Sequence, residues 1–223
     1  MRISILAGDP DYMSVRCISW PDDEMLMSVE RKGKRLPAGF VPELRYIFRD
    51  PVKEGVVTDC PYMFTESTMV LSERAQEVLG PILAESGEFI DVRPDHEKKY
   101  RLFVCYRELD ALDLERVEYF PVELNFGERA IKRYAFKADV VEGAGIFRVK
   151  GLLNRLYASE RFTQLVVQHR LSGFRIRQLW DGERGPLATF DDPGLEWERY
   201  PPGFGSTVRE KRQAMRDMIA GRR

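Results

Sequence analysis

The sequence predicts an α+β fold, with a mixed or mainly antiparallel sheet and two principal helices packed against it. The first reason is a repeated helix-plus-strand unit, because residues 72–92 and 159–180 each follow the order helix, glycine, strand. The second reason is that strand-like runs joined by short polar turns outnumber the helical stretches. This argues against a regular winding of alternating parallel strands and helices.

Residues 1–65 form the least regular part of the sequence. Strand-like runs such as Ile3–Leu6 and Met25–Val29 are short, and prolines stand between them. Each proline removes a backbone donor and disfavours helix at the preceding residue, so we expect short strands and loops here and no long helix. The runs are too short to fold alone and no flexible linker follows them, which predicts a segment integrated with the core. The prolines are Pro10, Pro21, Pro37, Pro42, Pro51 and Pro61.

Residues 66–180 contain both predicted units and the strands between them. Ser72 is a good N-cap for the first helix, which we expect to end near Gly87. The second unit closes at Gly173 in the same way. Aromatic and β-branched residues predict two further strands, Tyr100–Tyr106 and Ile131–Ala138.

The tripeptide Ser-Glu-Arg opens both predicted helices, at positions 72 and 159. One interpretation is a shared site built from both Glu-Arg pairs. The other is two ordinary N-caps, each with an acidic residue in the first turn, where the helix dipole stabilises negative charge. We favour the second interpretation.

The composition excludes several classes of protein. Of the 223 residues, 43% are hydrophobic, which is enough for a sizeable core. The 35 basic and 36 acidic residues leave a net charge of −1, so we expect neither a nucleic-acid partner nor a membrane partner. No apolar run suits a membrane span or a secretion signal, which predicts a cytoplasmic protein. We expect Cys17, Cys60 and Cys105 to be reduced thiols in the core.

A search for catalytic motifs finds no dinucleotide fingerprint, phosphate-binding loop, nucleophile elbow or zinc-binding histidine pair. The segment 143–145 carries two glycines but reads as a turn. His96 lies in a charged loop and His169 near a helix end, so neither suggests a general base. We therefore expect no catalytic residue, no metal ligand and no cofactor.

Residues 181–223 are predicted to form an acidic loop followed by a basic tail helix. Between Asp181 and Glu198 six acidic residues and one basic residue give a local charge of −5, interleaved with aromatic side chains. Aromatic anchors among charges are typical of protein interfaces, so this segment is a candidate contact surface for a basic partner. The equally weighted alternative is a polar loop that its aromatic residues attach to the domain. The candidate contact residues are Trp180, Asp181, Glu183, Asp191, Asp192, Glu196 and Trp197.

The order of elements from Thr68 to Trp180 resembles the MXAN-type immunity protein domain of bacterial polymorphic toxin systems, formerly a domain of unknown function. The resemblance implies a small α+β protein, encoded beside a toxin, that protects its producer by binding that toxin. It implies no active-site residues, and residues 1–65 and the basic tail lie outside it. The strings that carry it are Met69–Arg74, Tyr100–Tyr106, Glu108–Asp113, Ile131–Phe136, Gly145–Gly151 and Leu156–Arg161, with Gly173 and Phe174 after them.

We therefore expect a cytoplasmic immunity protein that neutralises a cognate toxin by non-catalytic occlusion. One alternative is a metal-dependent hydrolase that reverses a toxin's modification, using carboxylate pairs such as Asp22 with Asp23 or Glu108 with Asp110. Another alternative is a structural or oligomerisation module, in which the paired units supply a self-complementary face for a homo-oligomer.

Overall fold

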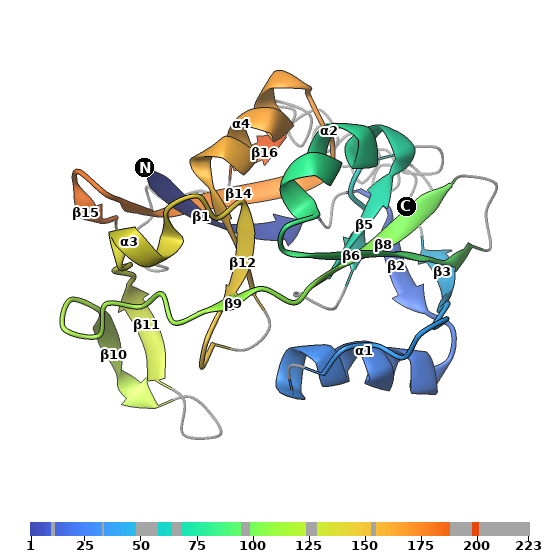
Figure 1. The fold of residues 1–223 in the computed structure, drawn as a ribbon, viewed down its shortest axis with the longest axis horizontal. Coiled ribbons are helices and arrows are strands. Elements are labelled where there is room, and N and C mark those ends of the chain that lie inside the picture. Colours follow the sequence, from blue (N-terminus) through green and yellow to red (C-terminus); the bar gives the residue numbers. More distant parts are fainter. Residues whose placement is uncertain are drawn as a thin grey trace, which may run out of the picture.

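The computed structural model describes residues 1–9, 12–32, 34–47, 58–63, 68–94, 99–123, 129–152, 155–187 and 198–200. They form mixed, mainly antiparallel sheets with helices packed against them, which confirms the predicted α+β class (Figure 1). The described helices are α1 (Trp20–Lys32), α2 (Glu73–Leu83), α3 (Ala138–Val141) and α4 (Glu160–Gln168). No helix in these ranges is both long enough and apolar enough to cross a bilayer.

The two predicted helix-plus-strand units are present and share one topology. In the first unit, β5 (Thr68–Ser72) and β6 (Gly87–Asp91) flank α2 in sequence, and both pair antiparallel with β8 (Tyr100–Cys105), which lies between them. In the second, β13 (Leu156–Ser159) and β14 (Phe174–Asp181) flank α4 and pair antiparallel with β1 (Arg2–Gly8). Each unit is therefore a strand, helix and strand closed around a third strand, which follows soon after in the first unit and comes from the start of the chain in the second.

Shorter strands extend these sheets and add two more. The sheet of β1 continues through β12 (Ile146–Val149) to β9 (Glu108–Leu109) on one side, and β15 (Gly185–Pro186) and β16 (Glu198–Tyr200) pair with β14 on the other. Strands β4 (Tyr62–Met63), β2 (Ser14–Cys17), β3 (Glu43–Ile47) and β7 (Arg93–Pro94) form a four-stranded sheet in that order. Strands β10 (Glu118–Glu123) and β11 (Arg129–Arg133) form a separate ribbon.

Three apolar clusters hold these layers together. The central cluster lies where α2 packs against α4, and Leu79, Phe103 and Phe162 are fully buried in it. Successive side chains of a strand point to opposite faces, so Leu102 and Val104, on either side of Phe103, lie in a second cluster. This cluster also contains residues of α1 and of the sheet of β2. A third cluster, rich in aromatic rings, covers the other face of the β1 sheet. Both sheets of the repeat are therefore covered on both faces.

One prediction for residues 1–65 is wrong. This part of the chain contains the 13-residue helix α1, although the prolines predict no long helix. Met25–Val29, a strand-like run in the sequence, lies within it. Pro21 lies in the first helical turn, where a backbone N–H has no intrahelical partner to lose. The Ser19 hydroxyl accepts a hydrogen bond from the Asp22 N–H at 3.2 Å, so the chain before Pro21 caps the helix. The proline starts this helix instead of breaking it.

A buried arginine attaches α1 to the rest of the fold. Arg148 of β12 donates to the Val29 carbonyl in the last turns of α1 at 3.1 Å, and to the Glu108 carboxylate at 2.8 Å. The side chain of Arg148 is nearly buried, so these charge-assisted bonds satisfy a guanidinium that water does not reach freely.

Both repeat units need a glycine where the second strand begins, Gly87 as the first residue of β6 and Gly173 just before β14. A Cβ atom at Gly87 would lie 2.0 Å from the Val104 carbonyl oxygen. A Cβ atom at Gly173 would lie 2.3 Å from the Cys60 carbonyl oxygen, and Gly173 also has φ of +88°. These glycines therefore allow the backbone to approach a neighbouring strand or loop more closely than any side chain permits.

Gly173→Ala should destabilise the protein far more than Gly39→Ala, although both positions have positive φ, +88° and +77°. The backbone conformation costs an alanine about 1–2 kcal/mol at either site. Only at Gly173 does the new Cβ also meet backbone, so its total loss should exceed about 3 kcal/mol. Urea denaturation of both variants measures the difference, and equal losses would show that the close contact at Gly173 carries no cost.

Candidate functional site

The predicted contact surface of residues 180–197 lies only partly within the described residues. Trp180 is 3% exposed and packs edge-on against Phe136 in the aromatic cluster, with ring centroids 6.0 Å apart. Its side chain therefore faces the core and anchors the first residue of the predicted contact surface to the aromatic cluster. Four of the seven predicted residues, Asp191, Asp192, Glu196 and Trp197, lie outside the described residues.

Asp181 organises the turn that follows β14. Its carboxylate accepts hydrogen bonds from the Glu183 N–H at 2.9 Å and the Arg184 N–H at 3.4 Å, and pairs with Arg2 at 3.3 Å. The bond from Glu183, followed by that from Arg184 and the pairing with Arg2, holds the pKa of the Asp181 carboxyl below its usual range. The Glu183 side chain is exposed on the same turn, so it presents negative charge to solvent.

The three cysteines are buried free thiols, as the sequence predicts. Burial raises the pKa of Cys17 and of Cys105 to about 12, and raises that of Cys60 further. Because the thiolate is the reactive form, these side chains are inert near neutral pH. Across the described ranges, no three His, Cys, Asp or Glu side chains gather as a group that could hold a metal ion.

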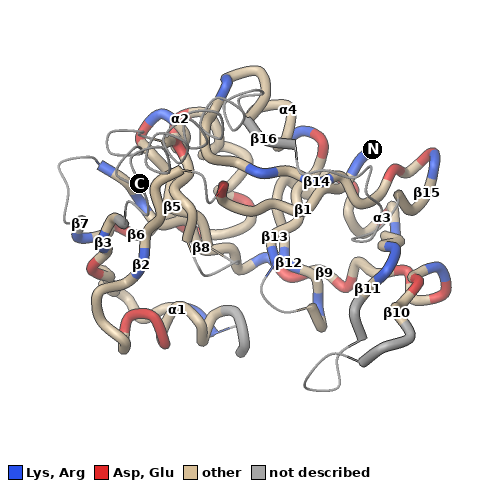
Figure 2. Tube along the Cα trace, turned by 180° about the vertical axis from the view of Figure 1, so that it is seen from behind, with Lys and Arg blue, Asp and Glu red and all other residues tan. Residues whose placement is uncertain are grey.

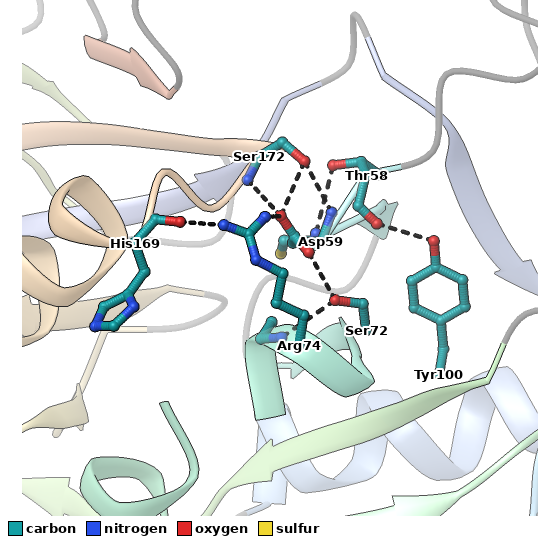
Figure 3. A network of polar contacts seen from close by, with 9 residues as sticks. Thr58, Asp59, Ser72, Arg74, Tyr100, His169 and Ser172 are labelled. Carbon is teal, nitrogen blue, oxygen red and sulfur yellow. Dashed lines mark hydrogen bonds and ion pairs between the residues drawn. The ribbon is translucent and has the colours of Figure 1, made fainter. Parts of the chain in front are cut away.

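A polar cluster that the sequence does not reveal surrounds Asp59 (Figure 3). The Asp59 carboxylate accepts from the Ser72 hydroxyl at 2.8 Å and from the Ser172 N–H at 2.9 Å. It also pairs with Arg74 at 3.3 Å, and the same guanidinium donates to the carbonyl of His169 at the end of α4. The cluster thus links the start of α2 to the turn that follows α4.

This cluster has the geometry of a structural junction. The Ser72 hydroxyl that donates to Asp59 also accepts from the Ala75 N–H at 3.2 Å, which makes Ser72 the N-cap that the sequence predicts. The oxygens of Asp59 are occupied by donors from two elements, which leaves the carboxylate poorly placed to take a proton from a substrate. The negative charge lies at the N-terminus of α2, where the helix dipole stabilises it.

The two Ser-Glu-Arg triplets do not share a site. Arg74 of the first pairs with Asp59, whereas Glu160 of the second pairs with Arg2 at 3.6 Å. Ser159 makes no capping bond, and its hydroxyl donates to the Gly145 carbonyl at 3.2 Å. Only the first triplet therefore caps its helix through the serine side chain.

Two grooves open on the surface. One, of about 420 Å³, runs between α4 and strands β1 and β14, and polar side chains such as Gln164, Gln168 and Gln178 line it. The other, of about 330 Å³, lies at the start of α1, between Trp20 and the arginines of β2 and β3.

Replacing Asp59 should destabilise the protein without changing its fold. Asp59→Ala removes the acceptor for Ser72, Ser172 and Arg74 at once, so we expect the free energy of unfolding to fall by about 3 kcal/mol. Glu73→Ala, which removes an exposed carboxylate at the same helix start, should cost less than about 1 kcal/mol. Thermal and urea denaturation test both, and an Asp59→Ala protein as stable as the wild type would contradict a junction role.

The sequence of this chain matches the model of a known protein family. Residues 8–181 match the immunity protein family Imm11, a range that covers both helices of the repeat and reaches well into residues 1–65, beyond the stretch that carried the sequence resemblance. Among curated proteins, no sequence matches this one. Because the family match spans well over half of the 223 residues, the chain belongs to the immunity protein family Imm11.

Proposed function

We propose that this chain is a cytoplasmic immunity protein that binds a cognate antibacterial toxin and neutralises it without catalysis. Membership of the immunity protein family carries the proposal. An inhibitor of this kind must capture its toxin before damage accumulates, which requires fast association and a dissociation constant in the nanomolar range or below.

Two features of the described polar groups support binding over chemistry. The Asp59 carboxylate is occupied by donors from the protein itself, and the thiols of Cys17, Cys60 and Cys105 stay protonated near neutral pH. These groups serve the fold and are poor nucleophiles or bases. The protein would then act through its surface, by covering the active site of the toxin or holding it in an inactive conformation.

The acidic segment 181–198 is our proposed region for the first encounter with a basic toxin. Its local charge of −5 would attract a basic surface over several ångströms, because association rates respond to such fields. The exposed Glu183 supports this role, and the burial of Trp180 gives the segment a fixed start. The segment therefore contributes mainly to the rate of association.

Co-expression with the toxin candidate encoded beside this chain tests the function. We expect this chain to restore growth to cells that the neighbour otherwise kills, and to form a stoichiometric complex with nanomolar or tighter affinity by calorimetry. A toxic neighbour that this chain neither binds nor neutralises would contradict the proposal. A harmless neighbour, with no partner recovered from the native cell, would also contradict it.

Reversing charge at Asp191 and Asp192 tests the acidic segment. The variant Asp191→Lys, Asp192→Lys should associate more slowly with the toxin and lose most of the salt dependence of the association rate. Stopped-flow kinetics across a range of ionic strength measures both effects. Unchanged association kinetics would remove this segment from the proposed interface and leave the proposed function untouched.

A further inference from the structure

The start of α1 leaves a large aromatic side chain uncovered. Trp20 is 69% exposed, and Ile18 and Met25, close to it along the chain, are also exposed. With Val41, half of the eight large apolar side chains that are exposed in the described ranges belong to residues 18–41. Tryptophan is among the residues that most often anchor protein contacts.

Hydrogen bonds to backbone groups hold this region in place. The Ile18 N–H donates to the Glu43 carbonyl at 2.9 Å, and the Asp22 carboxylate accepts from the Glu43 N–H at 3.2 Å. Arg148 fixes the other end of the helix through the Val29 carbonyl. Trp20 therefore projects from a rigid support, which reduces the entropy lost when a partner binds.

Positive charge lies beside the exposed tryptophan. Arg16 of β2 and Arg45 of β3 occupy directly opposite register positions, both exposed, and both line the groove of about 330 Å³ next to Trp20. Like charges directly opposite each other destabilise a sheet. Neither arginine forms an ion pair with any residue that the structure describes.

The charged groups that line the groove sum to a positive value, because the guanidiniums of Arg16 and Arg45 face one carboxylate, that of Asp23. Asp22 does not line the groove, and its carboxylate accepts from the Glu43 N–H. Arg93 of β7 lies in register with the exposed Glu43, so those two charges offset each other. Figure 2 shows short blue segments on β2, β3 and β7, and red in the first turn of α1. A carboxylate from a partner would therefore relieve the repulsion between Arg16 and Arg45.

We propose that this surface, which we call the Trp20 groove, is a toxin-contact site that takes an apolar side chain against Trp20 and a carboxylate against Arg16 and Arg45. This inference rests on the proposed function and assigns it a surface. Tryptophan and arginine are the residues most enriched among those that dominate binding energy at protein interfaces. The groove thus sets how long the complex lasts, through the dissociation rate.

A second copy of this chain is a poorer occupant than a different protein. A two-fold symmetric contact places the same patch on both partners. With the two-fold axis at the arginine pair, that arrangement would bring Arg16 and Arg45 of one copy against the same guanidiniums of the other. Since neither arginine forms an ion pair with a described residue, the pair favours a partner that supplies its own acidic side chain.

Two substitutions with matched controls test the inference. Trp20→Ala should weaken toxin binding by at least about 30-fold, mainly through faster dissociation, whereas Leu114→Ala, at a side chain 67% exposed, should change it less than about twofold.

Arg45→Glu places a carboxylate opposite Arg16, so the sheet keeps its stability while the groove loses its positive charge. We expect it to weaken binding by about 10-fold or more, and Lys132→Glu, the same charge change on exposed β11, to leave binding within about twofold.

Surface plasmon resonance against the toxin, with circular dichroism to confirm folding, separates the outcomes. Wild-type binding that both groove variants retain would overturn the Trp20 groove and leave the proposed function standing. A wild-type chain that neither binds nor protects would overturn both. A dimer in sedimentation velocity that Trp20→Ala abolishes would also overturn it, because the occupant would then be a second copy.

Discussion

The packing of α2 against α4 is the contact on which the rest of this fold depends. Each helix covers one face of its own three-stranded unit, and the two buried helix faces meet in a single apolar cluster that contains Leu79 and Phe162. Since that cluster uses the inner faces of both sheets, the outer faces are left for the aromatic cluster and for α1. The Asp59 junction closes the polar end of the same interface, where one helix begins and the other ends.

This division places rigid material at the centre and both proposed contact surfaces at the periphery. The central cluster and its junction use their polar groups internally, so they offer little to a partner. Trp20 and its arginines lie on a helix start and a sheet face that the core supports from behind, and the acidic turn after β14 starts from a buried tryptophan. A surface built on fixed elements can bind tightly because few side chains must be ordered on association.

Local signals explain what the sequence could predict. The cap at Ser72 depends on its own neighbours, and a glycine after a helix is a local signal, so the repeated unit could be predicted. The contacts that require Gly87 and Gly173 come from other segments and could not. The role of Asp59 could not be predicted, because its partners come from distant segments and no local pattern marks them. The sequence left open whether Trp180 faces a partner or attaches its loop to the domain, because its inward position depends on a register shift in the pairing of β14 with β1, which leaves Leu179 as an extra residue. Helix α1 could not be predicted, because Pro21 lies in its first turn and a proline that starts a helix looks the same in the sequence as one that prevents a helix.

The place of β1 in the second unit has a consequence for synthesis on the ribosome. The first unit draws all of its strands from one short stretch of chain, so it can assemble as soon as that stretch has emerged. The second unit closes around a strand made long before its partners, since Ile3 pairs with Ser159 and Trp180. During that interval both edges of β1 lack their final hydrogen-bond partners, which exposes the nascent chain to mispairing and makes it a natural client for chaperones.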